Sequence, residues 1–379
     1  MKKKFKIAVN TRFLIPNKLE GIGTYTHQVL QRLVKQMPEI EFHFLFDRNF
    51  SEDYIYSTNI FPHKLSPQAR HPFLWYWWFE KSVTKWLKNN PVDLFLSLDS
   101  FMALKTKTPT FLVMHDLAFE HYPKHVPLLV RKYYQYYFPK YAKNAALVFA
   151  VSNFTKNDII SKYGIEIEKV KIAYCGVSDV YKSLSEKEKI QTRNQISKGE
   201  KYFICIGSLN PRKNIQRVVQ AFNLFKKETS ENFKLLIVGA KAWKTNILFE
   251  EINTSKYKED IIVEGHLEPH KLSLLLASAE ALVFPSLFEG FGLPIVEAYQ
   301  CNTAVISSNN SSTKEIGEGL AILVNPLEII EIKDAMIKIA SKTNPINEAL
   351  VFEKLSIYNW DKTVEVFKEE IYKFLERKI

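Results

Sequence analysis

The sequence predicts an α/β protein built from two doubly wound, Rossmann-like domains that face each other across a cleft. Short apolar runs alternate with helical patterns over most of the 379 residues, which is typical of parallel strands joined by right-handed helical crossovers. A polar, charged stretch over residues 182–200 interrupts this alternation, and we interpret it as a linker. A chain of this length also suits two ordinary cores better than one.

The first domain is expected over residues 1–182. Helical patterns cover residues 25–35 and 130–143. The apolar runs around them have the length and β-rich composition of buried strands. These predicted strands are residues 5–9, 42–46, 94–98, 110–114 and 146–150.

The second domain is expected over residues 183–360, followed by a terminal helix over residues 361–379. One apolar stripe along this helix needs a partner surface, and it consists of Trp360, Val364, Phe367, Ile371 and Phe374. Ligands of open α/β sheets bind at the carboxyl ends of the strands, so two such domains predict a cleft for a two-part substrate. The predicted strands are residues 202–206, 235–238, 261–263, 281–284, 304–306 and 321–324.

Cysteine content and hydropathy indicate the cellular compartment of the protein. Cys175, Cys205 and Cys301 are scattered, with no Cys-x-x-Cys pair or His cluster, which indicates reduced thiols rather than a disulfide framework or zinc site. The basic N-terminus leads into a strand pattern rather than a signal sequence, and no window is long and apolar enough to span a membrane. We expect a cytoplasmic protein, either soluble or peripheral at the inner face of the cell membrane.

Charge is concentrated in the first half of the chain. Residues 1–180 contain 25 Lys and Arg against 15 Asp and Glu, whereas the remaining residues are nearly neutral. Such asymmetry predicts an anionic partner for the first domain. Anionic lipid and a phosphorylated acceptor both qualify. Nucleic acid is not expected, because the basic residues lie in no recognition motif.

The most informative stretch runs from Glu289 to Glu297, directly after a predicted strand. Gly290 and Gly292 allow a close approach of the backbone to a ligand. Pro294 marks the start of a helix, whose first N–H groups can bind phosphate. Glu297 can accept hydrogen bonds from a ribose diol, and Glu289 from a sugar ring.

Three further stretches follow predicted strands. Arg212 and Lys213, in the loop that begins at Gly207-Ser208, form a cationic pair that can clamp a diphosphate. Gly21-Ile22-Gly23 forms a glycine-rich turn that can touch phosphate but lacks the rest of a dinucleotide fingerprint. His115 also stands at a strand end, where a structural and a catalytic role are equally expected. There is no Asp-x-Asp motif, so cations and helix N-termini rather than a metal ion are expected to stabilise the leaving group.

These stretches together resemble the retaining glycosyltransferases of family 4, which have the GT-B fold. The likeness extends over nearly the whole chain. The segments that carry it are Arg12, Gly21-Ile22-Gly23, His115-Asp116, Val151-Ser152-Asn153-Phe154, Pro211-Arg212-Lys213-Asn214, Val238-Gly239, Glu289 to Glu297, and Asn359-Trp360.

The resemblance implies that Glu297 binds the donor ribose, Glu289 the transferred sugar, and Arg212 with Lys213 the diphosphate. His115 would contact the sugar near the reacting carbon, and the leaving phosphate would help deprotonate the acceptor. The terminal helix would cross back to the first domain. No cofactor or metal is implied. Further donor contacts are implied at Gly21, Gly23, Gly207, Ser208, Lys241, Gly265, His266, Leu267, Gly290, Phe291, Gly292 and Leu293.

The chain departs from the family pattern at two positions. Ser208 stands where many relatives carry an Arg, which leaves more of the diphosphate charge to Arg212 and Lys213. Asn302 replaces a Gly that usually serves packing.

The resemblance also predicts a function. Pro-Arg-Lys-Asn is common in mannosyl- and rhamnosyltransferase-like relatives, so we expect transfer of a mannose- or rhamnose-like hexose, with GDP-mannose as the first donor to test. The acceptor would be a glycan or lipid-linked sugar in surface polysaccharide synthesis. Aromatic and basic residues interleave over residues 72–86 and 131–143, which suits a membrane interface, a lipid-diphosphate acceptor or an aromatic core. The alternative function is a non-catalytic subunit that binds sugar nucleotides on the same fold.

Overall fold

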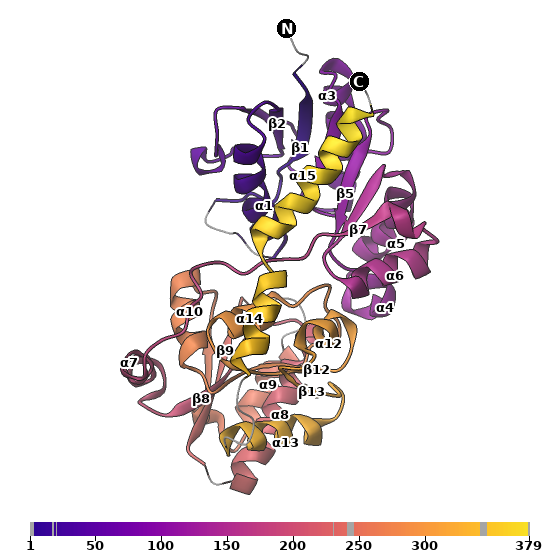
Figure 1. The fold of residues 1–379 in the computed structure, drawn as a ribbon. Helices are drawn as coiled ribbons and strands as arrows, with labels where there is room; N and C mark the ends of the chain where they lie inside the picture. Colours follow the sequence, from indigo (N-terminus) through magenta and orange to yellow (C-terminus); the bar gives the residue numbers. More distant parts are fainter. Residues whose placement is uncertain are drawn as a thin grey trace. The chain divides into compact units, whose positions relative to one another are not determined.

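The computed structural model describes residues 4–16, 19, 21–229, 231–240, 246–341 and 347–377. The chain forms two compact units (Figure 1). Unit 1 comprises Met1–Cys175 and Asn359–Ile379, and unit 2 comprises Gly176–Tyr358. The boundaries expected from the sequence were residues 182 and 360. The two units are described separately.

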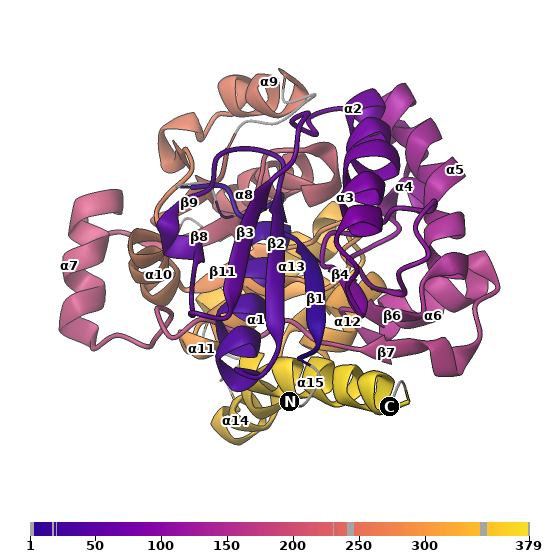
Figure 2. The ribbon, with the colours of Figure 1, turned by 90° about the horizontal axis from the view of Figure 1, so that it is seen from above.

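Unit 1 is built on a seven-stranded parallel sheet with the order β3-β2-β1-β4-β5-β6-β7. Figure 2 shows β1, β2 and β3 side by side. The sequence predicted five of these strands and missed β3 and β7, which lie at the two edges. The strands are β1 (Lys6–Asn10), β2 (Glu41–Phe46), β3 (Ile60–Lys64), β4 (Leu94–Ser97), β5 (Thr110–Met114), β6 (Leu147–Ala150) and β7 (Val170–Ile172).

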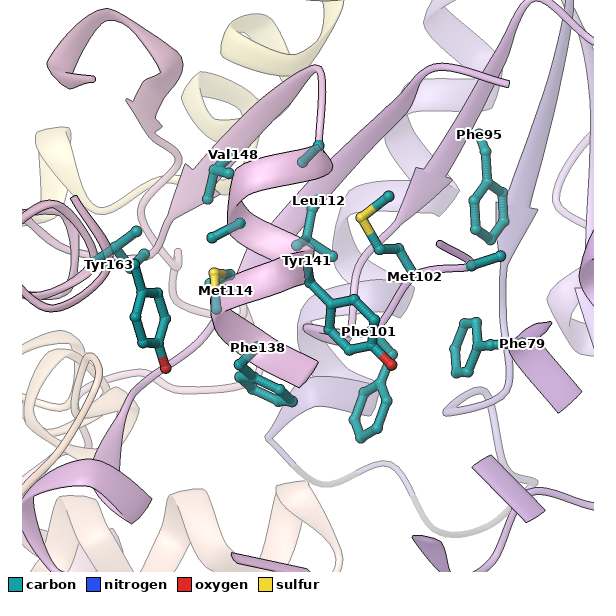
Figure 3. Packing of buried hydrophobic residues seen from close by; sticks show 14 of the residues in the cluster. Phe79, Phe95, Phe101, Met102, Leu112, Met114, Phe138, Tyr141, Val148 and Tyr163 are labelled. Atoms are coloured by element: carbon teal, nitrogen blue, oxygen red, sulfur yellow. The ribbon is translucent and has the colours of Figure 1, made fainter. Parts of the chain in front are cut away.

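The helices of unit 1 bury many of its aromatic side chains. The ring of Phe101 lies 5.6 Å from that of Phe79 and 5.5 Å from that of Phe138, and Tyr141 belongs to the same core (Figure 3). Aromatic residues of the stretches 72–86 and 131–143 thus contribute to a core. The helices are α1 (Ile22–Gln36), α2 (Pro72–Trp77), a π-helical segment (Trp78–Val83), α3 (Thr84–Asn89), α4 (Ala118–His121), α5 (Leu128–Asn144), α6 (Asn153–Tyr163) and α15 (Trp360–Glu376).

Helix α15 carries the apolar stripe predicted from the sequence. Trp360, Val364, Phe367 and Ile371 are buried, and the helix packs against α1. Partly buried Phe374 stacks edge-on against Phe111 of β5, with ring centroids 5.3 Å apart. The stripe therefore attaches the end of the chain to unit 1, as predicted.

Unit 2 contains a six-stranded parallel sheet with the order β10-β9-β8-β11-β12-β13. All six strands were predicted from the sequence. They are β8 (Lys201–Ile206), β9 (Phe233–Val238), β10 (Ile261–Glu264), β11 (Ala281–Phe284), β12 (Ala304–Ser308) and β13 (Ile322–Val324). The accompanying helices are α7 (Glu186–Ser197), α8 (Ile215–Thr229), α9 (Asn246–Thr254), α10 (Pro269–Ser278), α11 (Leu293–Gln300), α12 (Ser311–Gly317), α13 (Ile329–Ala340) and α14 (Glu348–Ile357).

The linker interpretation of residues 182–200 is wrong, because most of this stretch forms helix α7. A capping box starts the helix: the Ser185 N–H donates to Glu188 Oε2 at 2.8 Å, and the Glu188 N–H donates to Ser185 Oγ at 3.4 Å. Arg193 then pairs with Glu280 at 2.8 Å. Caps and polar contacts, rather than an apolar stripe, stabilise this helix.

Both sheets have a topological switch point, where the strand order reverses. In unit 1 it lies between β1 and β4, and in unit 2 between β8 and β11. The loops that leave these neighbouring strands diverge to opposite faces of the sheet and leave a crevice at the carboxyl ends. The candidate site residues are found mainly at the carboxyl ends of the strands in the two sheets.

Candidate active site

The loop between β11 and α11 carries Glu289 and is fixed by residues that follow β12. The single O–H of Ser312 is shared between the carbonyl oxygens of Glu289 at 2.8 Å and Phe291 at 2.9 Å. The Glu289 N–H donates to Ser311 Oγ at 3.2 Å. Gly290, Phe291 and the Glu289 side chain are buried. This loop is therefore held in one conformation by side chains outside the predicted motif.

Glu289 lies between the two predicted cations. Its Oε2 accepts from Arg212 Nη1 at 3.0 Å, and its Oε1 accepts from Lys213 Nζ at 2.8 Å. Burial acts to raise the pKa of the Glu289 carboxyl, but the charges of Arg212 and Lys213 outweigh it and keep the pKa below its ordinary value. The structure thus brings together three of the predicted residues as one charged cluster.

Arg212 and Lys213 are positioned by a short turn after β8. Asn210 caps this turn by accepting from the Arg212 N–H at 3.1 Å. Asn214 follows in a left-handed conformation and donates from Nδ2 to the Pro285 carbonyl at 3.0 Å. The turn after β8 and the loop after β11 are therefore bonded directly across the switch point of unit 2.

Glu297 lies in helix α11 and contacts a residue that the sequence did not single out. The hydroxyl of buried Tyr181 is hydrogen-bonded to its carboxylate. Burial raises the pKa of Glu297 to about 7, although Tyr181 and Lys213 act in the opposite direction. Close to neutral pH this carboxyl can therefore accept hydrogen bonds from a diol, but it loses that capacity in acid.

Glycines make the remaining turns of unit 2. Gly292 is the N-cap of α11 with φ of 106°, a conformation that side chains disfavour, and Leu293 is the first residue of that helix. Gly239, after β9, lies so close to β8 that a Cβ would stand 2.0 Å from the Gly207 carbonyl oxygen. Gly239 thus allows the loops that follow β8 and β9 to lie against each other.

The other residues predicted to contact the donor are spread along the same edge. Ser208 follows β8 and accepts at its Oγ from Asn210 Nδ2 at 3.0 Å. Gly265, His266 and Leu267 follow β10, which is separated from β8 by β9. Lys241 lies outside the described residues.

In unit 1, His115 follows β5. Its Nε2 lies 2.7 Å from the Leu98 carbonyl oxygen, so Nε2 carries the proton and Nδ1 is left as an acceptor. Burial lowers the pKa of His115 and favours this neutral form. Gly21 and Gly23 lie at the start of α1, whose Tyr25 packs edge-on against the imidazole with centroids 5.1 Å apart. His115 is thus oriented as a neutral hydrogen-bond acceptor.

The sequence reasoning missed Tyr181, Ser311 and Ser312. The two serines stand in a polar Asn-Asn-Ser-Ser-Thr run after the predicted strand at 304–306, so the rule that polar residues at strand ends form sites could have found them. Tyr181 follows no predicted strand end and gave no such signal.

Within the described ranges, no group of three or more His, Cys, Asp or Glu side chains could hold a metal ion. Cys175, Cys205 and Cys301 are buried thiols. No helix in the described part of the chain has the length and apolar character needed to cross a bilayer.

Two family models match the chain. A model for Glycosyltransferase Family 4 matches residues 19–180, and one for Glycosyl transferases group 1 matches residues 186–350. Among curated proteins, O-antigen chain mannosyltransferase B of Escherichia coli is 28% identical over 57% of this chain and 57% of that protein. O-antigen chain mannosyltransferase RfbU of Salmonella typhimurium is 27% identical over 57% and 56%. These alignments span little more than half of each relative.

Solved structures share the fold over almost the whole chain. Sucrose-phosphate synthase from Thermosynechococcus elongatus superposes with a TM-score of 0.80 at 15% identity, covering 99% of this chain and 100% of that one. Anabaena HepE in complex with UDP and glucose has a TM-score of 0.74 at 16% identity, covering 97% and 99%. The two family models together extend over most of the residues, and the chain belongs to the glycosyltransferases with the GT-B fold.

Proposed function

We propose that this protein is a retaining glycosyltransferase that moves a mannose-like hexose from a nucleotide sugar to a glycan or lipid-linked acceptor in surface polysaccharide synthesis. The observation that carries the proposal is the cluster of Glu289, Arg212 and Lys213 at the switch point of unit 2, with Glu297 on the adjoining helix. The names of the O-antigen mannosyltransferase relatives support the sugar and the pathway class.

The cluster suits the leaving group of such a reaction. Arg212 and Lys213 exceed the single charge of Glu289 by one positive charge and lie beside the N-terminus of α11, and both the net charge and the helix N-terminus stabilise a diphosphate. Glu297 and Tyr181 would bind the ribose hydroxyls, and Glu289 the hydroxyls of the transferred sugar. Fixed charges of this kind stabilise the departing phosphate most strongly at the transition state, when its negative charge develops.

The proposed transfer is balanced in bonds and protons. The bond between the anomeric carbon and the donor phosphate oxygen breaks, and the acceptor oxygen forms a bond to that carbon on the same face. The hydroxyl proton of the acceptor passes to the departing phosphate. In this scheme His115 accepts a hydrogen bond at Nδ1 from the sugar and does not carry the proton away, consistent with its lowered pKa.

A donor panel tests the proposal. The full chain is incubated with GDP-mannose, UDP-glucose and dTDP-rhamnose, and binding and slow hydrolysis are measured. GDP-mannose is the expected donor, and UDP-glucose is included because HepE was solved with it. Absence of binding and hydrolysis across the panel would contradict the proposal. Binding without hydrolysis, together with no transfer to cell-derived acceptors, would support a sugar-nucleotide-binding subunit instead.

We also propose that unit 1 approaches an anionic membrane surface, where a lipid-linked acceptor would be found. Apolar side chains on neighbouring helices α2 and α5 support this proposal, because Phe73 is 65% exposed and Leu129 is 73% exposed. Lys132 is exposed on α5 close to Leu129. Apolar and basic side chains presented together suit the interface of an anionic bilayer.

A further inference from the structure

A pocket of about 330 Å³ lies within unit 1, at the carboxyl ends of its strands. Arg12 follows β1 and Asp99 follows β4, so the pocket lies at the switch point of this sheet. Sequence reasoning had singled out His115, at one side of the pocket, but not the residues on its opposite side. Ligands of doubly wound domains bind at such positions.

The lining of the pocket includes an ion pair that is already satisfied. Arg12 Nε donates to Asp99 Oδ2, and the two residues are 5% and 2% exposed. Asp99 also accepts from the Phe101 N–H at 3.2 Å, and the guanidinium of Arg12 lies 4.2 Å from the centre of the Phe101 ring. These charges compensate each other, so a ligand must be recognised by the groups around them.

One side of the pocket presents arginine side chains. Buried Asp47 holds Arg48 by two hydrogen bonds, at 2.6 Å to Nε and 3.0 Å to Nη2, and also accepts from the Ala69 N–H at 2.8 Å. Trp75 donates from Nε1 to the Ala69 carbonyl at 3.0 Å. Both contacts fix the backbone next to Arg70. Arg48 keeps its Nη1 donors, and exposed Arg70 adds a second guanidinium to the same side.

Aromatic rings form a wall of the pocket. Trp75 and Tyr134 stack with centroids 5.7 Å apart and ring planes 12° apart, and Phe119 and Phe138 continue the same lining. Ring faces of this kind suit the apolar C–H face of a sugar. The wall therefore favours a carbohydrate over a purely ionic ligand.

The other side of the pocket presents acceptors. His115 offers Nδ1, because its Nε2 donates to the Leu98 carbonyl. Asp116 uses Oδ1 to accept from the Ala118 N–H at 2.9 Å and has lone pairs for further donors. In the sheet order, β2 and β5 are three strand spacings apart, or roughly 14 Å. The long arginine side chains extend across part of this distance. The distance that remains corresponds to the length of a sugar that carries one further group.

We infer that this pocket binds the glycosyl acceptor, and that the acceptor is a sugar with an anionic group at the end opposite its reacting hydroxyl. The phosphate or carboxylate contacts Arg48 and Arg70, the ring lies on Trp75, and the end that bears the reacting hydroxyl lies at Asp116, because Nδ1 of His115 is taken by the transferred sugar. This inference rests on the proposed function and adds the chemical class of the acceptor.

The test compares matched ligands on the full chain by isothermal titration. The probes are mannose 6-phosphate, methyl α-mannuronoside, neutral methyl α-mannoside and inorganic phosphate. At least one anionic sugar is expected to bind about tenfold or more tightly than the neutral sugar, the effect of one charge-assisted hydrogen bond. The phosphate and carboxylate probes identify which anion the pocket prefers.

Variants test whether the arginines of this pocket cause the preference for anionic sugars. Arg70→Gln is expected to reduce the preference for the anionic sugar to about threefold or less, because it removes one charged donor from an exposed position. Arg48→Gln is the second variant. If it does not fold, it is replaced by Arg48→Lys, which keeps the positive charge that faces Asp47. Arg377→Gln, at the exposed end of α15, is the matched control and leaves the preference unchanged.

Three results would overturn the inference. They are equal binding of neutral and anionic sugars, an unchanged preference in both Arg70→Gln and the Arg48 variant, and binding of inorganic phosphate as tight as that of the sugar phosphate. Hydrolysis of a nucleotide sugar without a preference for anionic sugars would contradict this inference and leave the proposed function standing. A preference for anionic sugars without nucleotide binding would contradict the proposed function, and the pocket would then be an anionic-sugar site without an acceptor role.

Discussion

Glu289 is buried between two cations, and this arrangement sets their positions before any ligand arrives. Its side chain is 9% exposed, against 24% for Arg212 and 12% for Lys213. Two cations held near each other repel, and the attraction of each cation to a carboxylate between them offsets this repulsion. The diphosphate of a donor would therefore meet charges that are already ordered, which reduces the reorganisation needed during the reaction.

The variant Glu289→Gln tests this arrangement. Removing the carboxylate leaves Arg212 and Lys213, which are partly exposed, without their charged acceptor, so we expect the free energy of unfolding to fall by about 1–3 kcal/mol. We expect kcat for donor hydrolysis to fall at least tenfold, or about 1.4 kcal/mol of barrier. Urea unfolding and steady-state kinetics measure the two effects. Glu318→Gln, an exposed carboxylate of the same unit, is the control, and equal kinetics in both variants would contradict the role of Glu289.

The raised pKa of Glu297 predicts that the stability of the folded chain depends on pH. Its pKa is raised to about 7 in the folded chain and returns to about 4.5 on unfolding. Between these pH values the folded state holds a proton that the unfolded state has lost, so the contribution of Glu297 to stability decreases as pH rises. Glu297→Gln is expected to raise the free energy of unfolding at pH 8 by about 1–2 kcal/mol and to change it little at pH 5.

The same residue is expected to control donor affinity in the opposite direction. The diol of a ribose needs the ionised carboxylate as acceptor, so KM for the donor should rise as pH falls below about 7, the pKa of Glu297. Donor KM in the Gln variant should be higher and nearly independent of pH in this range. A wild-type KM that stays flat between pH 6 and pH 8 would count against ribose binding by Glu297.

At the scale of elements, the packing of β8 against β9 depends on one glycine. Gly239→Ala would bring a Cβ to 2.0 Å from the Gly207 carbonyl oxygen, a backbone atom that cannot rotate away. We expect a loss of at least about 2 kcal/mol in stability, with separation of the two loops. Gly265→Ala, at the end of β10 with no atom within 4 Å of the new Cβ, is the control for unfolding. Similar losses in the two variants would refute this explanation.

The elements that the sequence predicted are those with a single dominant signal. Central strands such as β5 and β11 are fully buried and appear as continuous apolar runs. Edge strand β3 has Pro62 and mostly exposed or half-buried residues, and β7 has three residues, so neither gives such a run. Helix α7 lacks an apolar face, and its capping box at Ser185 was the available signal.

The residues of the candidate site also fall into two groups, those that the sequence could reveal and those that it could not. Residues within one motif, such as Glu289 and Glu297, could be found because glycine, proline and strand context occur together in the sequence. Contacts between motifs could not, because the meeting of Arg212 with Glu289 depends on β8 and β11 being neighbours in the sheet. Tyr181 lies over a hundred residues before its partner Glu297, and only the fold relates the two positions.

At the scale of the whole molecule, the positive charge of the first half of the chain accompanies an exposed apolar surface. The excess of Lys and Arg over residues 1–180 accounts for most of the net charge of +11. On α2 and α5, Phe73, Trp77, Leu129 and Tyr136 are all exposed. Burial of such side chains at a bilayer interface adds to the attraction between basic residues and anionic lipid.

Vesicle sedimentation tests whether this surface binds membrane. We expect the protein to sediment with phosphatidylglycerol vesicles but not with phosphatidylcholine vesicles, and binding to weaken as salt screens the charges. Leu129→Ser is expected to reduce binding about fivefold, since the lost apolar burial is worth about 1 kcal/mol. Phe352→Ser, at a 78% exposed position of unit 2, is the matched control. Equal binding to both lipids, or equal losses in both variants, would contradict membrane binding by this surface.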